Sequence, residues 1–155
     1  MKNIAICVIS SRAQNYDHYV DIWIKNIHYC QKYLKNIKIY LLYTKSQNQK
    51  HSIDSLNISN QIKNHNFILD DNNDFNGFCE NNKNGFVPYI LSKRIRCLEL
   101  IKDNFDIFYN CNISQFINLE NFNKYVQTNN IRYSGDWVWK NSLRNDIIKH
   151  KYLKN

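Results

Sequence analysis

Glycine and proline are scarce in this chain of 155 residues, which has three and one of them. Tight β-turns depend on both residues, so their scarcity argues against an all-β protein and favours helices joined by longer polar loops. Long apolar runs are missing too, because no segment approaches the roughly 18 apolar residues of a membrane span. The short apolar run from Ile4 to Ile9 is too brief for a signal-peptide core. We therefore expect a cytoplasmic protein without a membrane span.

Several common site motifs are also missing. No GxGxxG follows the first apolar run and no GxxxxGK[ST] occurs, which disfavours a dinucleotide site and excludes a P-loop. The histidines are dispersed and no CxxC pair occurs, so zinc is not indicated. The five cysteines lie mostly within apolar runs, where we expect them as small buried side chains, and the pattern suits a reducing compartment.

The net charge of +8 raises the alternative of a nucleic-acid-binding protein. The lysines and arginines are scattered along the chain, however, and no stretch is dense enough for a basic arm. A phosphate-bearing small molecule needs only two or three such charges and gains from the same positive field. Charge therefore favours a small anionic ligand over nucleic acid.

Hydrophobic periodicity predicts an α/β protein. Apolar runs with many β-branched residues alternate with segments of helical spacing, and the opening strand, helix and strand form a βαβ unit. The runs are apolar throughout, as in parallel strands covered on both faces. The predicted strands span 3–10, 37–44, 67–70, 106–110 and 131–134, and the predicted helices span 17–34, 87–104, 118–126 and 142–151, with a weak helix near 53–62.

Ligands of such folds bind at the carboxyl ends of the strands. The three strand ends are Ser10-Ser11-Arg12, Thr44-Lys45-Ser46 and Asn110-Cys111-Asn112. Residues 71–85 are rich in Asn and Gly and predict a loop, either a surface connection or a lid. In the helix over 87–104 the apolar spacing places Lys93, Arg94 and Arg96 on the outer face.

The segment over 88–122 resembles a recurrent part of GT-A glycosyltransferases. In that family a helix carrying a lysine precedes a strand and a second helix that starts Asn-Leu. The matching positions are Lys93 in the helix, Phe105-Asp106 at the strand entrance, Asn112, Ser114 and Phe116 at its exit, and Asn118-Leu119 at the next helix. The resemblance implies a three-layer, Rossmann-like GT-A fold, with residues 1–155 forming one nucleotide-sugar-binding domain.

The resemblance also implies a function and a site. A nucleotide-diphosphate sugar would be the donor, and a glycan or other molecule the acceptor. The donor-binding residues would be Ser10, Ser11, Arg12, Lys93, Asn110, Asn112 and Ser114. The chain ends soon after 131–135, where longer family members continue into an acceptor half, so the catalytic residue is unknown and Asp136 is only a weak candidate.

The family's metal-binding Asp-x-Asp is replaced here by Asn110-Cys111-Asn112. Amides are poor substitutes for carboxylates around Mg²⁺ or Mn²⁺, so no metal ligand is assigned and a cation would enter only with the nucleotide diphosphate. Arg12 and Lys93 would then neutralise the diphosphate. A rival cation loop is the acidic stretch 70–74.

Other assignments stay open. A catalytically inactive binding or scaffold module on the same fold is the first alternative to a transferase, and nucleic-acid binding is the second. Trp137 and Trp139 have two interpretations, stacking on a sugar ring or packing in the core. Exposed aromatic side chains on a short domain are compatible with a homodimer.

Overall fold

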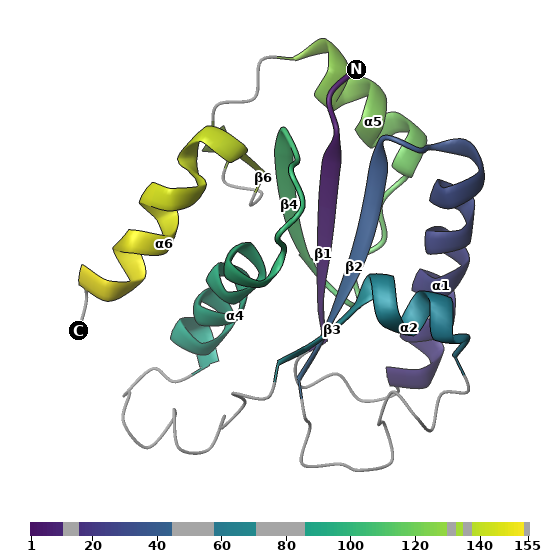
Figure 1. Cartoon of the computed structure of the whole chain (residues 1–155), viewed down its shortest axis with the longest axis horizontal. Helices are drawn as coiled ribbons and strands as arrows, with labels where there is room; N and C mark the ends of the chain where they lie inside the picture. The colour runs from purple at the N-terminus through teal and green to yellow at the C-terminus, as the bar shows by residue number, and fades with distance from the viewer. Residues whose placement is uncertain (11–15, 45–57, 71–85, 130–132, 135–137, 154–155) are drawn as a thin grey trace.

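The computed structural model describes residues 1–10, 16–44, 58–70, 86–129, 133–134 and 138–153. Its centre is a mixed sheet of six strands in the order β3-β2-β1-β4-β6-β5 (Figure 1). The strands are β1 (Ile4–Ser10), β2 (Ile37–Thr44), β3 (Phe67–Asp70), β4 (Ile107–Asn112), β5 (Tyr133–Ser134) and β6 (Val138–Lys140). The first four strands run parallel, and β6 pairs antiparallel with β4 and β5.

The helices cover both faces of this sheet. They are α1 (Tyr16–Tyr33), α2 (Asn60–Asn66), α4 (Phe86–Leu100), α5 (Leu119–Thr128) and α6 (Arg144–Leu153), with a 3₁₀ turn at Asn141–Leu143. The predicted α/β class, the mostly parallel sheet and the two helical layers are confirmed. The architecture is compatible with a Rossmann-like fold.

A hydrophobic core lies on each face of the sheet, and β1 contributes side chains to both because it lies in the middle of the sheet. Ile4, Ile6 and Val8 point towards α1 and α5, where they pack with Trp23 of α1. The alternate residues, including Cys7 and Ile9, point towards α4 and α6. Burying each Ile or Val side chain fully contributes roughly 1.5–3 kcal/mol, which explains why a continuous apolar run occupies this position.

Several predicted boundaries are confirmed. Asn118 is the N-cap of α5, and its side-chain oxygen accepts from the backbone N–H of Asn121 at 3.0 Å. The weak helix predicted near 53–62 is only partly correct, because within the described residues the helix begins at Asn60 and continues to Asn66 as α2. Trp139 lies in β6 and is buried in the core, so its packing role is confirmed, whereas Trp137 lies outside the described residues.

The helix predicted over 87–104 differs in two respects. It ends at Leu100, where Arg144 of α6 donates from Nε to the carbonyl oxygen of Leu98 at 2.9 Å and also bonds the carbonyl of Ile101. The outward placement of Lys93 and Arg94 is wrong, since these side chains are 4% and 5% exposed. Both lie one helical turn before the buried pair Cys97 and Leu98, and therefore on the same stripe of the helix.

Candidate functional site at the carboxyl edge of the sheet

The order in which the chain adds strands to the sheet reverses between β1 and β4, although these two strands are parallel. The chain adds β2 and β3 on one side of β1 and then crosses to place β4 on the other side. In open α/β sheets ligands bind outside the carboxyl ends of the strands at such a switch point. The last residue pair across it is Ile9 and Asn112. The fold thus indicates the Ser10 and Asn112 ends of these strands as the candidate site.

The turn after β4 is held in place by specific hydrogen bonds. The backbone N–H of Ile113 continues the ladder to the carbonyl of Ile9 at 3.0 Å. The carbonyl of Ile113 in turn accepts from the indole N–H of Trp23 at 2.7 Å. The side-chain oxygen of Gln115 accepts from the backbone N–H of Asn112 at 2.8 Å. These contacts fix the exit of β4 against β1 and α1.

Two buried cationic side chains lie on the α4 side of this edge. Lys93 and Arg94 are consecutive in α4, and Arg94 donates from one terminal nitrogen to the carbonyl of Asn110 at 3.3 Å. Burial lowers the pKa of the Arg94 guanidinium, although an arginine stays charged in a folded protein. Buried charges cost free energy and are rare unless they are paired or serve a site.

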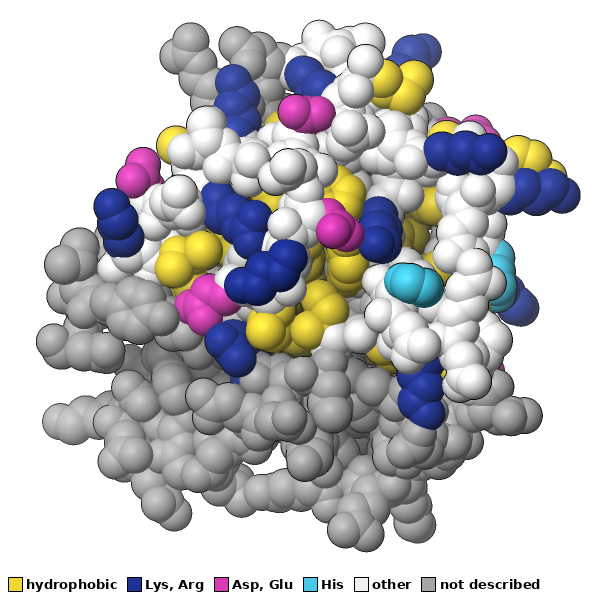
Figure 2. Space-filling view, viewed as in Figure 1, with side chains coloured by type: hydrophobic (Ala, Val, Ile, Leu, Met, Phe, Trp, Pro, Cys, Tyr) yellow, Lys and Arg dark blue, Asp and Glu magenta, His cyan; other side chains and the backbone are white. Residues whose placement is uncertain are grey.

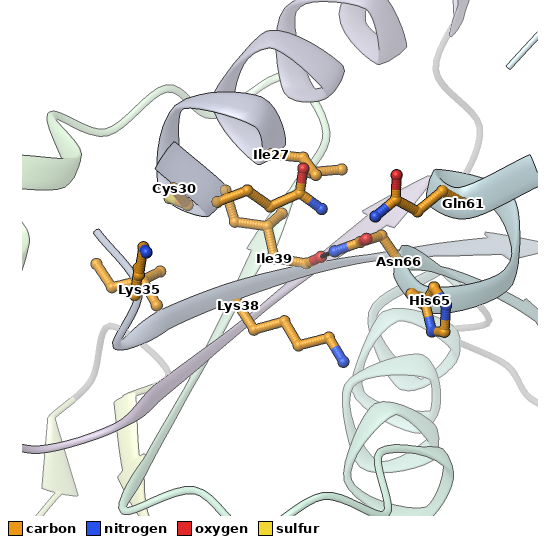
Figure 3. Close-up of a pocket in the computed structure, with 10 residues that line it drawn as sticks. Ile27, Cys30, Lys35, Lys38, Ile39, Gln61, His65 and Asn66 are labelled. Carbon is orange, nitrogen blue, oxygen red and sulfur yellow. Dashed lines mark hydrogen bonds between the residues drawn. The ribbon is translucent and has the colours of Figure 1, made fainter. Parts of the chain in front are cut away.

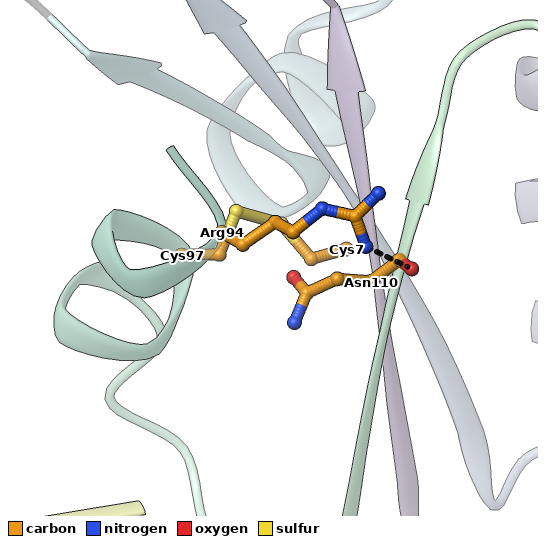
Figure 4. The surroundings of a disulfide bond; sticks show 4 residues. All are labelled: Cys7, Arg94, Cys97 and Asn110. Carbon is orange, nitrogen blue, oxygen red and sulfur yellow. Dashed lines mark hydrogen bonds between the residues drawn. A yellow bond between two sulfur atoms is a disulfide. The ribbon is translucent and has the colours of Figure 1, made fainter. Parts of the chain in front are cut away.

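Asn110 lies beside Arg94. Its side chain is 2% exposed, and neither its amide nitrogen nor its amide oxygen has a hydrogen-bond partner. Figure 4 shows Asn110 and the Arg94 guanidinium beside a disulfide that joins Cys7 of β1 to Cys97 of α4. The disulfide anchors α4 to the strand that carries the switch point.

The disulfide corrects the expectation that the cysteines serve only as small buried side chains. Cys7 and Cys97 are bonded, with a Cα–Cα distance of 6.5 Å, whereas Cys30 and Cys111 are free and buried. Burial raises the pKa of both free thiols to about 12. They are therefore protonated at neutral pH and are poor nucleophiles.

Five of the predicted donor-binding residues lie on α4, β4, the turn after β4 and β1. Lys93 is buried in α4, Asn110 lies within β4, Asn112 ends β4, and Ser114 is exposed in the turn that follows. Ser10 ends β1 in register with Tyr43. Ser11, Arg12 and Asp136 lie outside the described residues, as do Lys45, Ser46, the loop 71–85 and all of the acidic stretch 70–74 except Asp70.

The side chains on β4 do not fit a divalent cation. Alternation along the strand turns Asn110 and Asn112 to the α4 side and Cys111 to the opposite core. The two amides are neutral, and the Arg94 guanidinium beside Asn110 repels a cation. Among the described residues no group of three or more His, Cys, Asp or Glu side chains is arranged to hold a metal ion. The arrangement instead suits an anion.

Sequence reasoning missed three features of this edge, namely Arg94, the Trp23 indole contact and the disulfide. The spacing of Arg94 from Leu98 and Ile101 was a usable signal, because i, i+4 and i+7 share one helical face. The other two features join residues 90 positions apart and carry no local pattern.

The wider surface is mixed in charge. Lys and Arg side chains are distributed over the described part of the face in Figure 2, with acidic side chains among them. Within the described ranges, no helix is both long and apolar enough to cross a membrane.

Comparison of the chain with protein-family models, with curated proteins and with solved structures gives no match. The case for a function therefore depends on the geometry of the chain itself.

Proposed function

We propose that this protein binds a nucleotide-diphosphate sugar at the carboxyl edge between β1 and β4, in the manner of a GT-A-type glycosyltransferase domain. The observation that carries the proposal is the pair of buried cationic residues Lys93 and Arg94 in α4, the second of which bonds the carbonyl of Asn110 in β4, the strand beyond the switch point. A diphosphate is the part of such a ligand that needs positive charge, and the low dielectric of a buried site strengthens that attraction.

The polar groups around the cations complement the rest of such a ligand. The amide oxygen of Asn112 is buried without a partner, like both polar atoms of Asn110. An amide oxygen accepts from a sugar hydroxyl or a base N–H, and the amide nitrogen donates to a phosphate oxygen. A bound ligand would thus relieve part of the desolvation cost of these groups.

Transfer of the sugar to an acceptor is the activity we propose for this site. The leaving diphosphate gains charge as the glycosidic bond breaks, and positioned cations stabilise that charge without a metal ion. Lys93, Arg94 and Arg12 are the candidates for this role. Asp136 stays the candidate catalytic residue by sequence alone, and the acceptor is a glycan or another hydroxyl-bearing molecule.

One observation favours a binding or scaffold module as the second candidate. By the resemblance to GT-A transferases, Asn110 and Asn112 stand where that family carries carboxylates, and Asn110 is buried beneath α4 rather than open to solvent. A site of this kind can hold an anion without turning it over. Release of nucleotide diphosphate from a bound donor, even slowly by hydrolysis, would exclude this candidate.

The test is calorimetric and thermal titration of the protein with UDP, GDP and their common sugar conjugates, with and without Mn²⁺. A ligand that binds only the folded state stabilises it by about 2.7 kcal/mol at a hundred times its Kd. We expect one nucleotide class to raise the melting temperature, with the same shift when Mn²⁺ is omitted. The absence of any shift at millimolar ligand contradicts the proposal.

Arg94→Met tests the location of the site. We expect it to weaken nucleotide binding at least about tenfold, because a charge-assisted contact to phosphate is lost. Arg96→Met is the matched control on the same helix, since Arg96 pairs with Glu99 at 2.9 Å. Equal losses in both variants would show that the effect is general rather than local.

A further inference from the structure

A second pocket lies far from the carboxyl edge, at the start of β2. The strand β3 pairs only with the second half of β2, from Leu41 to Thr44, and so leaves the edge of the first half uncovered by a strand. The end of α1 and the helix α2 flank this edge and enclose a pocket of about 290 Å³ (Figure 3). This volume is near the lower end for small-molecule sites.

The floor and the rim of this pocket differ in chemistry. The buried floor is apolar and consists of Ile27, Cys30, Ile37 and Ile39. The exposed rim is polar and consists of Gln31, Lys35, Gln61 and His65. Lys38 also borders the pocket, but its ammonium group pairs with Asp103 at 3.2 Å. None of the described lining residues carries a carboxylate, and Lys35 adds a positive charge, so the electrostatic field of this lining favours an anion.

Asn66 adds a specific acceptor to this pocket. Its side chain is 3% exposed, and its amide nitrogen donates to the carbonyl of Ile39 at 2.7 Å. That bond fixes the orientation of the amide, since only the nitrogen can donate. The amide oxygen is buried and has no hydrogen-bond partner. A buried acceptor in this state is free to accept from a ligand that carries an O–H or N–H donor.

We propose that this pocket binds a small anionic polyol, such as a sugar phosphate. A hydroxyl group of the ligand donates to the amide oxygen of Asn66. Its anionic group lies at the rim between Lys35 and His65, which border opposite ends of the pocket (Figure 3), and its carbon skeleton covers the apolar floor. The two glutamines supply further donors and acceptors for hydroxyl groups. This site is separate from the nucleotide site proposed above and does not depend on it.

The test uses ribose 5-phosphate as the probe, followed by ¹⁵N–¹H correlation NMR of the full chain. Ribose and inorganic phosphate are titrated separately as the two halves of the probe. We expect ribose 5-phosphate to shift the side-chain amide signals of Asn66 and Gln61 and to bind about tenfold more tightly than either half alone. If ribose 5-phosphate shifts none of these signals at tens of millimolar (about the weakest binding such a titration detects), the proposal is overturned.

Two rim variants and one control locate the binding. Lys35→Glu and His65→Glu change exposed side chains, so we expect the fold to persist and the affinity to fall about tenfold or more in each. Lys25→Glu makes the same charge change at an exposed position of α1 outside the pocket and should leave the affinity within about twofold. Equal affinity in all three variants overturns the proposal, because the probe is then bound elsewhere.

A UDP titration of the same variants separates this proposal from the nucleotide site. We expect Lys35→Glu to leave any UDP response unchanged, and Arg94→Met to leave the ribose 5-phosphate response unchanged. A UDP response that falls with Lys35→Glu would mean that the two sites are one, and would overturn the assignment of a separate pocket.

Discussion

The indole N–H of Trp23 in α1 donates to the carbonyl oxygen of Ile113, 2.7 Å away, just beyond the end of β4. Trp23 is fully buried, and Ile113 is 2% exposed. The contact joins the first helix to the turn that borders the switch point, across 90 positions of sequence. This one hydrogen bond satisfies both the buried indole N–H and the buried carbonyl oxygen, each of which requires a partner.

Trp23→Phe removes this donor while keeping an aromatic ring in the core. We expect the free energy of unfolding to fall by about 1–3 kcal/mol from the unpaired carbonyl, with an added cost for the lost volume. Urea denaturation followed by circular dichroism measures the change. Tyr33→Phe is the control, since Tyr33 is 60% exposed and its substitution should change stability by no more than about 0.5 kcal/mol. An unchanged midpoint for Trp23→Phe would contradict the structural role of this bond.

The disulfide between Cys7 and Cys97 closes a loop with a sequence separation of 90. A cross-link of this span is worth about 4.6 kcal/mol in the chain-entropy description. We therefore expect dithiothreitol to lower the urea midpoint of the wild-type protein. The double variant Cys7→Ala, Cys97→Ala should start at the lower midpoint and not respond to the reductant. A wild-type protein indifferent to dithiothreitol, with no linked peptide in a non-reducing digest, would show that the bond does not form.

The pair Tyr40 and Asp103 predicts a dependence of stability on pH. The hydroxyl of Tyr40 donates to the Asp103 carboxylate at 2.8 Å and, with a second bond from Lys38, lowers the pKa of that carboxyl below its ordinary value. Burial, and then the same bond, raise the pKa of the Tyr40 phenol. The Asp103 carboxyl then stabilises the fold at pH values above about 4, and this contribution is lost as the pH falls below that value. The Tyr40 phenol stabilises the fold at pH values below about 10, and this contribution is lost as the pH rises above that value.

Tyr40→Phe tests this assignment by urea denaturation across the pH range. We expect the loss of stability above pH 10 to become shallower, because the buried phenol no longer ionises on unfolding. The acidic effect should be smaller, since the Asp103 side chain is 63% exposed and solvent screens its charge. Tyr33→Phe again serves as the control. Identical alkaline slopes for Tyr40→Phe and wild type would reject the assignment.

The N-cap hydrogen bond of α5 allows the contribution of one local contact to the free energy of unfolding to be measured. Asn118→Ala removes the acceptor of the Asn121 N–H, and we expect a loss of about 1 kcal/mol. Asn118→Ser should retain most of the stability, because a serine hydroxyl accepts the same hydrogen bond. Thermal denaturation of the three proteins measures the difference. Equal destabilisation by Ala and Ser would show that the cap oxygen contributes little.

The amino-acid sequence by itself determined the α/β class, the parallel strands and the positions of most helices. It could do so because these features follow from local periodicity: β1 is apolar at every position before Ser10, and α1 repeats its apolar residues at helical spacing. The Asn118 cap was also predictable, because a cap depends on residues three positions apart.

Only the tertiary structure decided which side chains meet at the carboxyl edge. Lys93 and Arg94 become buried because α4 docks on the sheet through the stripe that carries them, with Cys97 bonded to Cys7 of β1. The unpartnered amide atoms of Asn110 and the unpartnered amide oxygen of Asn66 likewise arise from the packing of a strand under one helix and of a short helix beside a strand edge. Such contacts join residues distant in sequence, and their free energy is set by burial and charge in the folded chain rather than by any local pattern.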